Sequence, residues 1–167
     1  MSRAAHMATK GPIPNINYPA LIRDEITRWE RQQALRVIRI KDHCCKRDVR
    51  GLGEGFCQKC RRKWISAYTH VTINFKSPES LIRYRQKCSK CDVLCKMQMP
   101  EDEFRRITQY AIESMKRCHL GIKTKQKKDD KAKTTPPHKC HLCEKCRFGE
   151  GPCCMPKAVV CKVPKLK

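Results

Sequence analysis

The stretches FCQKC (residues 56–60) and KCSKC (residues 87–91) carry the same Cys-x-x-Cys pair, and HLCEKC (residues 141–146) repeats it. Two sulfurs with this spacing can reach one metal ion from a single turn, and two such turns complete the tetrahedron that zinc prefers. The first two pairs therefore predict a zinc site made of Cys57, Cys60, Cys88 and Cys91. A closed site of four cysteines is structural, because it leaves no open position for a reacting water.

The number of cysteines allows two interpretations, a disulfide framework or metal sites. The chain has 14 cysteines among 167 residues. Its first residues, MSRAAHMATKGPIPN, lack the apolar segment of a secretory signal. Reduced thiols are therefore expected, and with them zinc and a cytoplasmic location, with the nucleus or a membrane surface as alternatives. No apolar run approaches the ~18 residues of a membrane span.

A second zinc site is predicted near the C-terminus, which gives two zinc ions in all. Cys143 and Cys146 anchor it, and the favoured set adds His138 and Cys153. Other candidates for this site are Cys140, His141 and Cys154. A third cluster at His43, Cys44 and Cys45 is a weaker alternative, Cys118 is expected in a core, and Cys95 and Cys161 have no predicted role.

The pattern of apolar and turn residues predicts an α+β fold. Residues 18–40 have helical spacing, with a possible break near 32–33 and with Asp24 and Glu25 near the favourable N-terminal end. Residues 50–56 are glycine-rich and predict a turn. The alternation of 63–75 predicts a strand whose buried face includes Ile65 and every second residue to Phe75, and 81–88 predicts the returning strand. Residues 99–121 predict a second helix, with Phe104, Ile107, Ala111, Met115 and Cys118 on its buried face.

These elements predict a small zinc-stabilised antiparallel hairpin or sheet packed with two helices, followed by a C-terminal cysteine-rich zinc knuckle. We expect a lead-in at 1–17, one zinc-binding domain at 18–154 with a basic flexible linker at 123–137, and a basic tail at 155–167.

The net charge of +22 is large for this length and indicates an acidic partner. RNA is the partner expected from the charge, and an anionic lipid surface is an alternative. The residues predicted to contact RNA are Arg61, Arg62, Lys63, Arg83, Arg85, Lys87, Arg105 and Arg106. Trp64 and Tyr68 could stack on bases, although for Trp64 the pattern favours packing against the zinc knuckle.

GFCQKCRRKWISAYTHVTINF (55–75), RQKCSKC (85–91) and the later pattern from His138 through CEKC to Cys153 resemble the 3CxxC-type zinc domain. This domain is found in receptor-transporting proteins and zygote arrest proteins, and the resemblance covers about residues 18–154. It implies that the three cysteine pairs bind zinc, with His138 and Cys153 beside the last pair.

The resemblance to zygote arrest proteins implies RNA binding. The resemblance to receptor-transporting proteins implies the alternative, an adaptor that helps to deliver a membrane receptor to the cell surface. An enzyme is not expected, because the sequence has no P-loop, no His-Glu-x-x-His and no zinc-deaminase signature.

Overall fold

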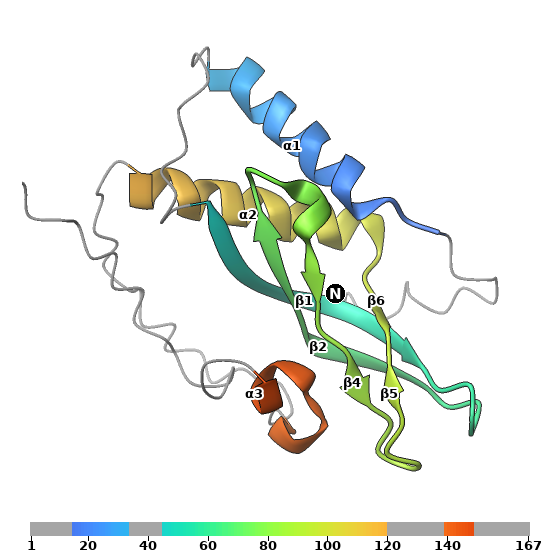
Figure 1. Ribbon diagram of the computed structural model, residues 1–167. Helices are drawn as coiled ribbons and strands as arrows, with labels where there is room; N and C mark the ends of the chain where they lie inside the picture. The colour runs from blue at the N-terminus through green and yellow to red at the C-terminus, as the bar shows by residue number, and fades with distance from the viewer. Residues whose placement is uncertain (1–14, 34–44, 120–138, 149–167) are drawn as a thin grey trace, which may run out of the picture.

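A computed structural model describes residues 15–33, 45–119 and 139–148 and has the predicted α+β class (Figure 1). The helices are α1 (Tyr18–Gln33), α2 (Glu101–His119) and α3 (Glu144–Phe148). The strands are β1 (Lys46–Phe56), β2 (Lys63–Asn74), β3 (Ile82–Arg83), β4 (Gln86–Lys87), β5 (Leu94–Cys95) and β6 (Met97–Gln98), and two 3-10 turns are η3 (Pro78–Ser80) and η4 (Cys140–Leu142). Residues 34–40 of the first predicted helix lie outside the described residues.

The long hairpin of the fold pairs β1 with β2, which corrects two predictions. Residues 50–56, predicted as a turn, form the second half of β1, in antiparallel register with β2 from Lys46↔Asn74 to Phe56↔Lys63. The segment 81–88, predicted as the main partner of β2, pairs with it only through the short β3, and then leaves to pair β4 with β5. The four-stranded sheet has the order β3-β2-β1-β6, and β4-β5 forms a separate pair.

The glycines of β1 permit the close approach of larger side chains. Gly55 lies opposite Trp64, and a Cβ atom at Gly55 would overlap the indole ring. A Cβ at Gly51 would lie 2.6 Å from Oε1 of Glu103 on α2. Because these glycines have no side chain, they leave room for Trp64 of β2 and Glu103 of α2. They lie within a strand and do not form a turn.

A β-bulge in the hairpin changes which residues of β2 face the core. The register passes from Gly51↔Thr69 to Gly53↔Ser66, so β2 contributes one extra residue. Beyond such a bulge the alternation is reversed. The predicted buried residues Thr69, Val71, Ile73 and Phe75 are buried, whereas Ile65 is 55% exposed, so its predicted place on the buried face is wrong.

The main core lies where α1 and α2 pack on one end of the sheet. The rings of Tyr18 and Phe104 meet edge to face with centroids 4.6 Å apart. The Tyr18 hydroxyl donates a hydrogen bond of 2.8 Å to the Met99 carbonyl, which ties α1 to the start of α2. The predicted stripe of α2 is confirmed, and the buried cluster comprises Tyr18, Leu21, Ile22, Val49, Val71, Ile73, Phe75, Met99, Phe104, Ile107, Ala111, Ile112 and Met115, with Cys118 packed against it.

Glu25 is a buried charge between the two helices. It was expected to act near the N-terminal end of α1, but α1 starts at Tyr18 and the Glu25 side chain is 2% exposed. Arg105 donates to its Oε1 at 2.9 Å, and Gln109 donates to its Oε2 at 2.9 Å. Hydrogen bonds to Glu25, and then to Glu101, raise the pKa of Arg105 above its ordinary value. Glu25 therefore joins α1 to α2 as half of an ion pair.

Candidate metal centre

The first two cysteine pairs occupy matching turns at the tips of two hairpins. Cys57 donates its backbone N–H to the Arg62 carbonyl at 2.9 Å, and Cys88 donates to the Val93 carbonyl at the same distance and the same spacing. The residue after each second cysteine has a left-handed backbone, with φ of 59° at Arg61 and 56° at Asp92. The β1–β2 turn and the β4–β5 turn are therefore equivalent knuckles on separate hairpins.

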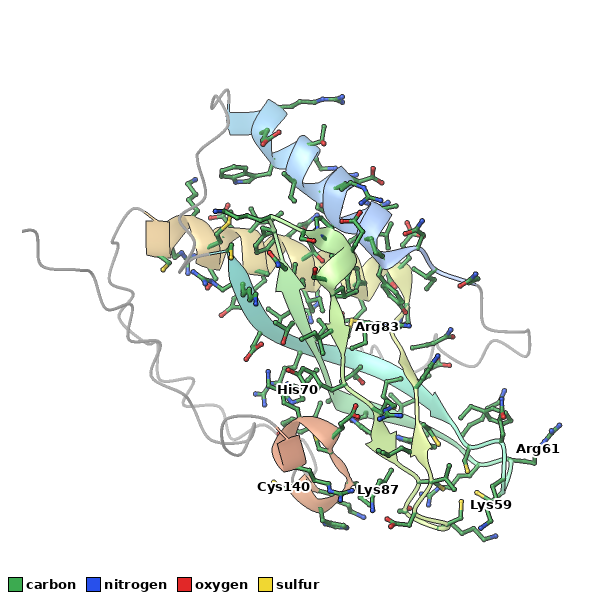
Figure 2. All side chains as sticks on the ribbon, in the orientation of Figure 1. Lys59, Arg61, His70, Arg83, Lys87 and Cys140 are labelled. Carbon is green, nitrogen blue, oxygen red and sulfur yellow. The ribbon has the colours of Figure 1, made fainter. Side chains whose placement is uncertain are left out.

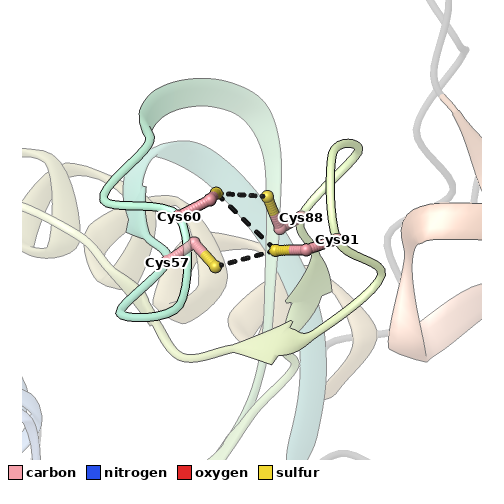
Figure 3. A group of neighbouring side chains, drawn as sticks. All are labelled: Cys57, Cys60, Cys88 and Cys91. Atoms are coloured by element: carbon pink, nitrogen blue, oxygen red, sulfur yellow. Dashed lines mark hydrogen bonds between the residues drawn. The ribbon is translucent and has the colours of Figure 1, made fainter.

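The four predicted sulfurs face one another across the gap between these turns (Figure 3). The Sγ atoms of Cys57 and Cys91 lie 3.2 Å apart, those of Cys60 and Cys88 lie 3.5 Å apart, and those of Cys60 and Cys91 lie 3.6 Å apart. All four lie within 4.8 Å of one another. Zn–S bonds of about 2.3 Å would place tetrahedral sulfurs about 3.8 Å apart, so Cys57, Cys60, Cys88 and Cys91 fit a zinc ion.

The environment of the cluster favours thiolate at some sulfurs and thiol at others. The backbone N–H of Cys60 and the thiol of Cys91 lower the pKa of Cys57 to about 6. The backbone N–H of Lys90 lowers the pKa of Cys88. The hydrogen bond between the Cys91 and Cys57 sulfurs, followed by burial, raises the pKa of Cys91 to about 12. A metal ion binds the thiolate form, so zinc must displace the remaining protons and its affinity falls as the pH falls.

A fifth sulfur, Cys95, lies beside the cluster and had no predicted role. It is 6% exposed and packs with Cys57 and Cys88. Its thiol points to the Val93 carbonyl at 3.4 Å, and burial followed by the charge of Cys57 raises its pKa to about 11. Cys95 is therefore a neutral packing residue. Trp64 packs against the same cysteines, as its alternative interpretation predicted.

A second cysteine cluster lies in residues 139–148, which we call the C-terminal module. It contains Cys140, Cys143 and Cys146, and Cys143 is 1% exposed. Cys143 forms an isolated bridge with Gln86, so the module adds to the free side of β4. This cluster could bind a second zinc ion. The predicted ligands His138 and Cys153, with Cys44, Cys154 and Cys161, lie outside the described residues, so the full ligand set stays a prediction.

The module is held against the sheet by two ion pairs. Arg85 donates to Oε1 of Glu144 through Nη2 at 2.7 Å and Nε at 3.0 Å, and its backbone N–H donates to Oε2 at 2.7 Å. Lys145 lies 2.7 Å from Asp48 and over the ring of Tyr84. Because Asp48 belongs to β1 and Arg85 precedes β4, the module lies against both hairpins that carry the knuckles.

The segment that contains the three cysteine pairs matches a known protein family. A family model for a zinc-binding domain, the 3CxxC zinc ribbon, matches residues 50–149, more than half of the chain. The chain belongs to the 3CxxC zinc-ribbon family. Searches of curated proteins and of solved structures found no match. The 3CxxC match spans all three cysteine pairs and both knuckle hairpins, and together with the sulfur geometry it identifies the chain as a zinc-binding module.

A membrane-spanning helix is absent from residues 15–33, 45–119 and 139–148, where no helix combines the required length and hydropathy.

The 3CxxC fold places the predicted basic residues in two different settings. Arg61, Arg62 and Lys63 are exposed at the first knuckle. Arg83 lies over the ring of Tyr18, 4.7 Å from its centroid. The other predicted residues contact carboxylates, in the pairs Arg85–Glu144, Lys87–Asp92, Arg105–Glu25 and Arg106–Glu103.

The Glu144→Gln substitution is expected to loosen the C-terminal module. The hydrogen bond from Arg85 holds the pKa of Glu144 below its ordinary value. The contact is therefore complete at pH values above the pKa of an unfolded-state carboxyl, and it is lost as the pH falls through the lowered folded value. We expect amide hydrogen exchange at 140–147 to accelerate by up to about fivefold at neutral pH.

The matched control is Glu113→Gln, a carboxyl on α2 away from the module. Equal acceleration in both variants, or none in Glu144→Gln, would show that this ion pair does not hold the module in place.

Proposed function

We propose that the 3CxxC domain binds RNA through the basic end of the molecule that carries the two knuckles. The observation that supports this proposal is a separation of charge. At the helical end Arg23, Arg105 and Arg106 contact carboxylates, whereas no carboxylate partner is found among the described residues for the exposed cations of the first knuckle. We call Lys59, Arg61, Lys63 and Lys90 the knuckle surface.

At the helical end the positive charge is largely balanced. Arg105 reaches Asp24, Glu25 and Glu101, Arg106 pairs with Glu103, and Arg23 pairs with Glu79. These arginines are held by neighbouring carboxylates, so they offer less attraction to a phosphate than a cation without a partner. Arg105 and Arg106, although basic, are for this reason weaker candidates for RNA contacts than the residues of the first knuckle.

The knuckle surface has the opposite balance. No Asp or Glu occurs between Glu54 and Glu79, a segment that includes Lys59, Arg61, Arg62 and Lys63. Within the described part of the chain, no acidic partner is found for Lys59, Arg61, Lys63 or Lys90, and all four are exposed. Figure 2 shows Lys59 and Arg61 at the tip of the β1–β2 hairpin, away from the helices. A closed four-thiolate zinc site adds only two negative charges, so the surface stays basic.

Neutralising the knuckle surface should weaken RNA binding more than an equal change of charge elsewhere. The test protein carries Lys59→Gln, Arg61→Gln and Lys63→Gln. The control carries Arg31→Gln, Lys46→Gln and Arg117→Gln, three exposed cations outside the knuckles. Because the knuckle triple can no longer neutralise about three phosphates, it should bind single-stranded RNA about 100-fold more weakly at about 0.1 M salt.

The measurement is a filter-binding or anisotropy titration of zinc-loaded, full-length protein at several salt concentrations. The slope of log K against log salt should become shallower by about 2 in the knuckle triple. An equal decrease of affinity in both triples would contradict a localised surface. An intact chain without affinity for RNA at low salt would remove the proposal and leave the receptor-adaptor alternative, whose test is surface display of a receptor after depletion of the protein.

A further inference from the structure

A cavity of about 410 Å³ opens beside the four-cysteine cluster, between the start of β2, strand β4 and the C-terminal module. Its walls include Trp64, Ser66, Tyr68, Gln86, Lys87 and Lys139. This volume lies in the range of small-molecule sites, about 300–1,000 Å³. The cavity is therefore large enough for one small, flat group and too small for a folded domain or a double helix.

One wall of the cavity is an immobilised indole. Trp64 lies over Gly55, where even a Cβ atom would overlap the ring. Its Nε1 donates to Oε1 of Gln86 at 3.4 Å, and Gln86 is itself fixed through Nε2 to the Tyr68 carbonyl at 3.0 Å. The ring also packs on the buried cysteines. An aromatic ring held in this way can stack on a ligand without a further loss of side-chain freedom.

The cavity also offers one unused polar group. The Ser66 hydroxyl oxygen accepts from Nε2 of Gln86 at 3.0 Å and from the Tyr68 backbone N–H at 3.2 Å. In the described part of the chain no group accepts a hydrogen bond from this hydroxyl, so Ser66 remains available as a hydrogen-bond donor. A ligand with a carbonyl oxygen or an aromatic nitrogen could accept it.

The rim of the cavity is positively charged. Arg62, Lys87 and Lys139 belong to its lining. Lys87 pairs with Asp92, whereas Arg62 contacts only the neutral Ser89 and Lys139 is exposed without an acidic partner among the described residues. Apolar and aromatic walls with a basic rim suit a ligand that has a flat ring and a phosphate.

We propose that this cavity accepts one unpaired base of a single-stranded RNA, stacked on the aromatic wall with its phosphate at the basic rim. The proposal rests on the proposed RNA-binding function and deepens it, because it makes the domain a reader of single strands. A base inside a duplex is stacked and paired, so it cannot enter without being displaced.

Tryptophan fluorescence tests the proposal directly, because the chain has only two tryptophans, Trp29 and Trp64. Trp29→Phe leaves Trp64 as the sole reporter, and Trp64→Phe leaves Trp29 as its matched control. Each zinc-loaded, full-length variant is titrated with a single-stranded oligonucleotide of RNA, a fully paired RNA duplex and inorganic polyphosphate. Only the single strand should quench Trp64, and none of the three should quench Trp29.

Tyr68→Ala supplies a second measurement that keeps Trp64 in place. It should weaken single-stranded RNA binding by about 5- to 150-fold, as the loss of one base-stacking aromatic does elsewhere. Tyr110→Ala, which removes a tyrosine exposed on α2, should have no effect.

Unchanged Trp64 fluorescence with RNA bound, or equal quenching by polyphosphate, would overturn the pocket and leave RNA binding to the knuckle surface intact. A chain that binds no RNA at all would overturn the proposed function and the pocket together.

Discussion

Replacing Cys88 with serine is expected to remove one zinc ion from each chain, whereas Cys95→Ser should leave the zinc content unchanged. Both sulfurs are buried beside the same knuckles, and they differ in chemistry. The Cys88 sulfur lies 3.5 Å from that of Cys60, inside the four-sulfur cluster. The thiol of Cys95 points to a backbone carbonyl, and burial raises its pKa, so it stays protonated.

Metal analysis of the purified, reduced variants measures the number of zinc ions per chain and so tests this prediction. The comparison separates the loss of a ligand from the loss of a buried cysteine, because a serine at either position creates a similar packing defect. Loss of zinc from both variants would indicate that the ion depends on packing around the cluster. Retention of zinc in Cys88→Ser would remove Cys88 from the site.

Arg105→Ala is expected to lower the free energy of unfolding by about 3–5 kcal/mol, which is typical when one partner of a buried ion pair is removed. Glu25 is 2% exposed and accepts hydrogen bonds from Arg105 and Gln109. Without the guanidinium, Glu25 would remain between the helices as a buried charge with only the neutral amide of Gln109 and the more distant Arg28, at 3.7 Å, beside it.

Arg23→Ala is the matched control, because Arg23 also links α1 to a carboxylate but both side chains of its pair with Glu79 are more than half exposed. Chemical denaturation of the two zinc-loaded variants should show a large shift for Arg105→Ala and little change for Arg23→Ala. Similar stability of both variants would show that water reaches Glu25 and solvates it.

The sequence predicted the four-sulfur cluster better than it predicted the sheet. Spacing within a Cys-x-x-Cys turn is local chemistry, so the pairs at 57–60 and 88–91 could be recognised without knowing how the chain folds. The missed strand β1 depends on distant residues. Its segment RGLGEGF resembles a turn until Trp64 of β2 and Glu103 of α2 occupy the space beside its glycines.

Two further features could not be inferred from local patterns. The bulge that exposes Ile65 is visible only in the register between two strands. Glu25 continues the apolar stripe of Ile22 and Trp29 along α1, but its burial depends on Arg105, which lies far away in the sequence on α2. The C-terminal cysteine pair was recognised from its spacing, while its docking through Arg85 and Asp48 required the fold.

The separation of the two knuckles onto different hairpins has a consequence for biosynthesis. The first knuckle can form as soon as β1 and β2 have been made, but it offers only two sulfurs. The remaining two are Cys88 and Cys91, and Cys91 lies 17 positions after the end of β2 at Asn74. At ordinary rates of translation this interval is about 1 to 3 seconds. During that time the nascent chain exposes a reactive half-site, so we expect its maturation to depend on a reducing environment and on metal supplied at the ribosome.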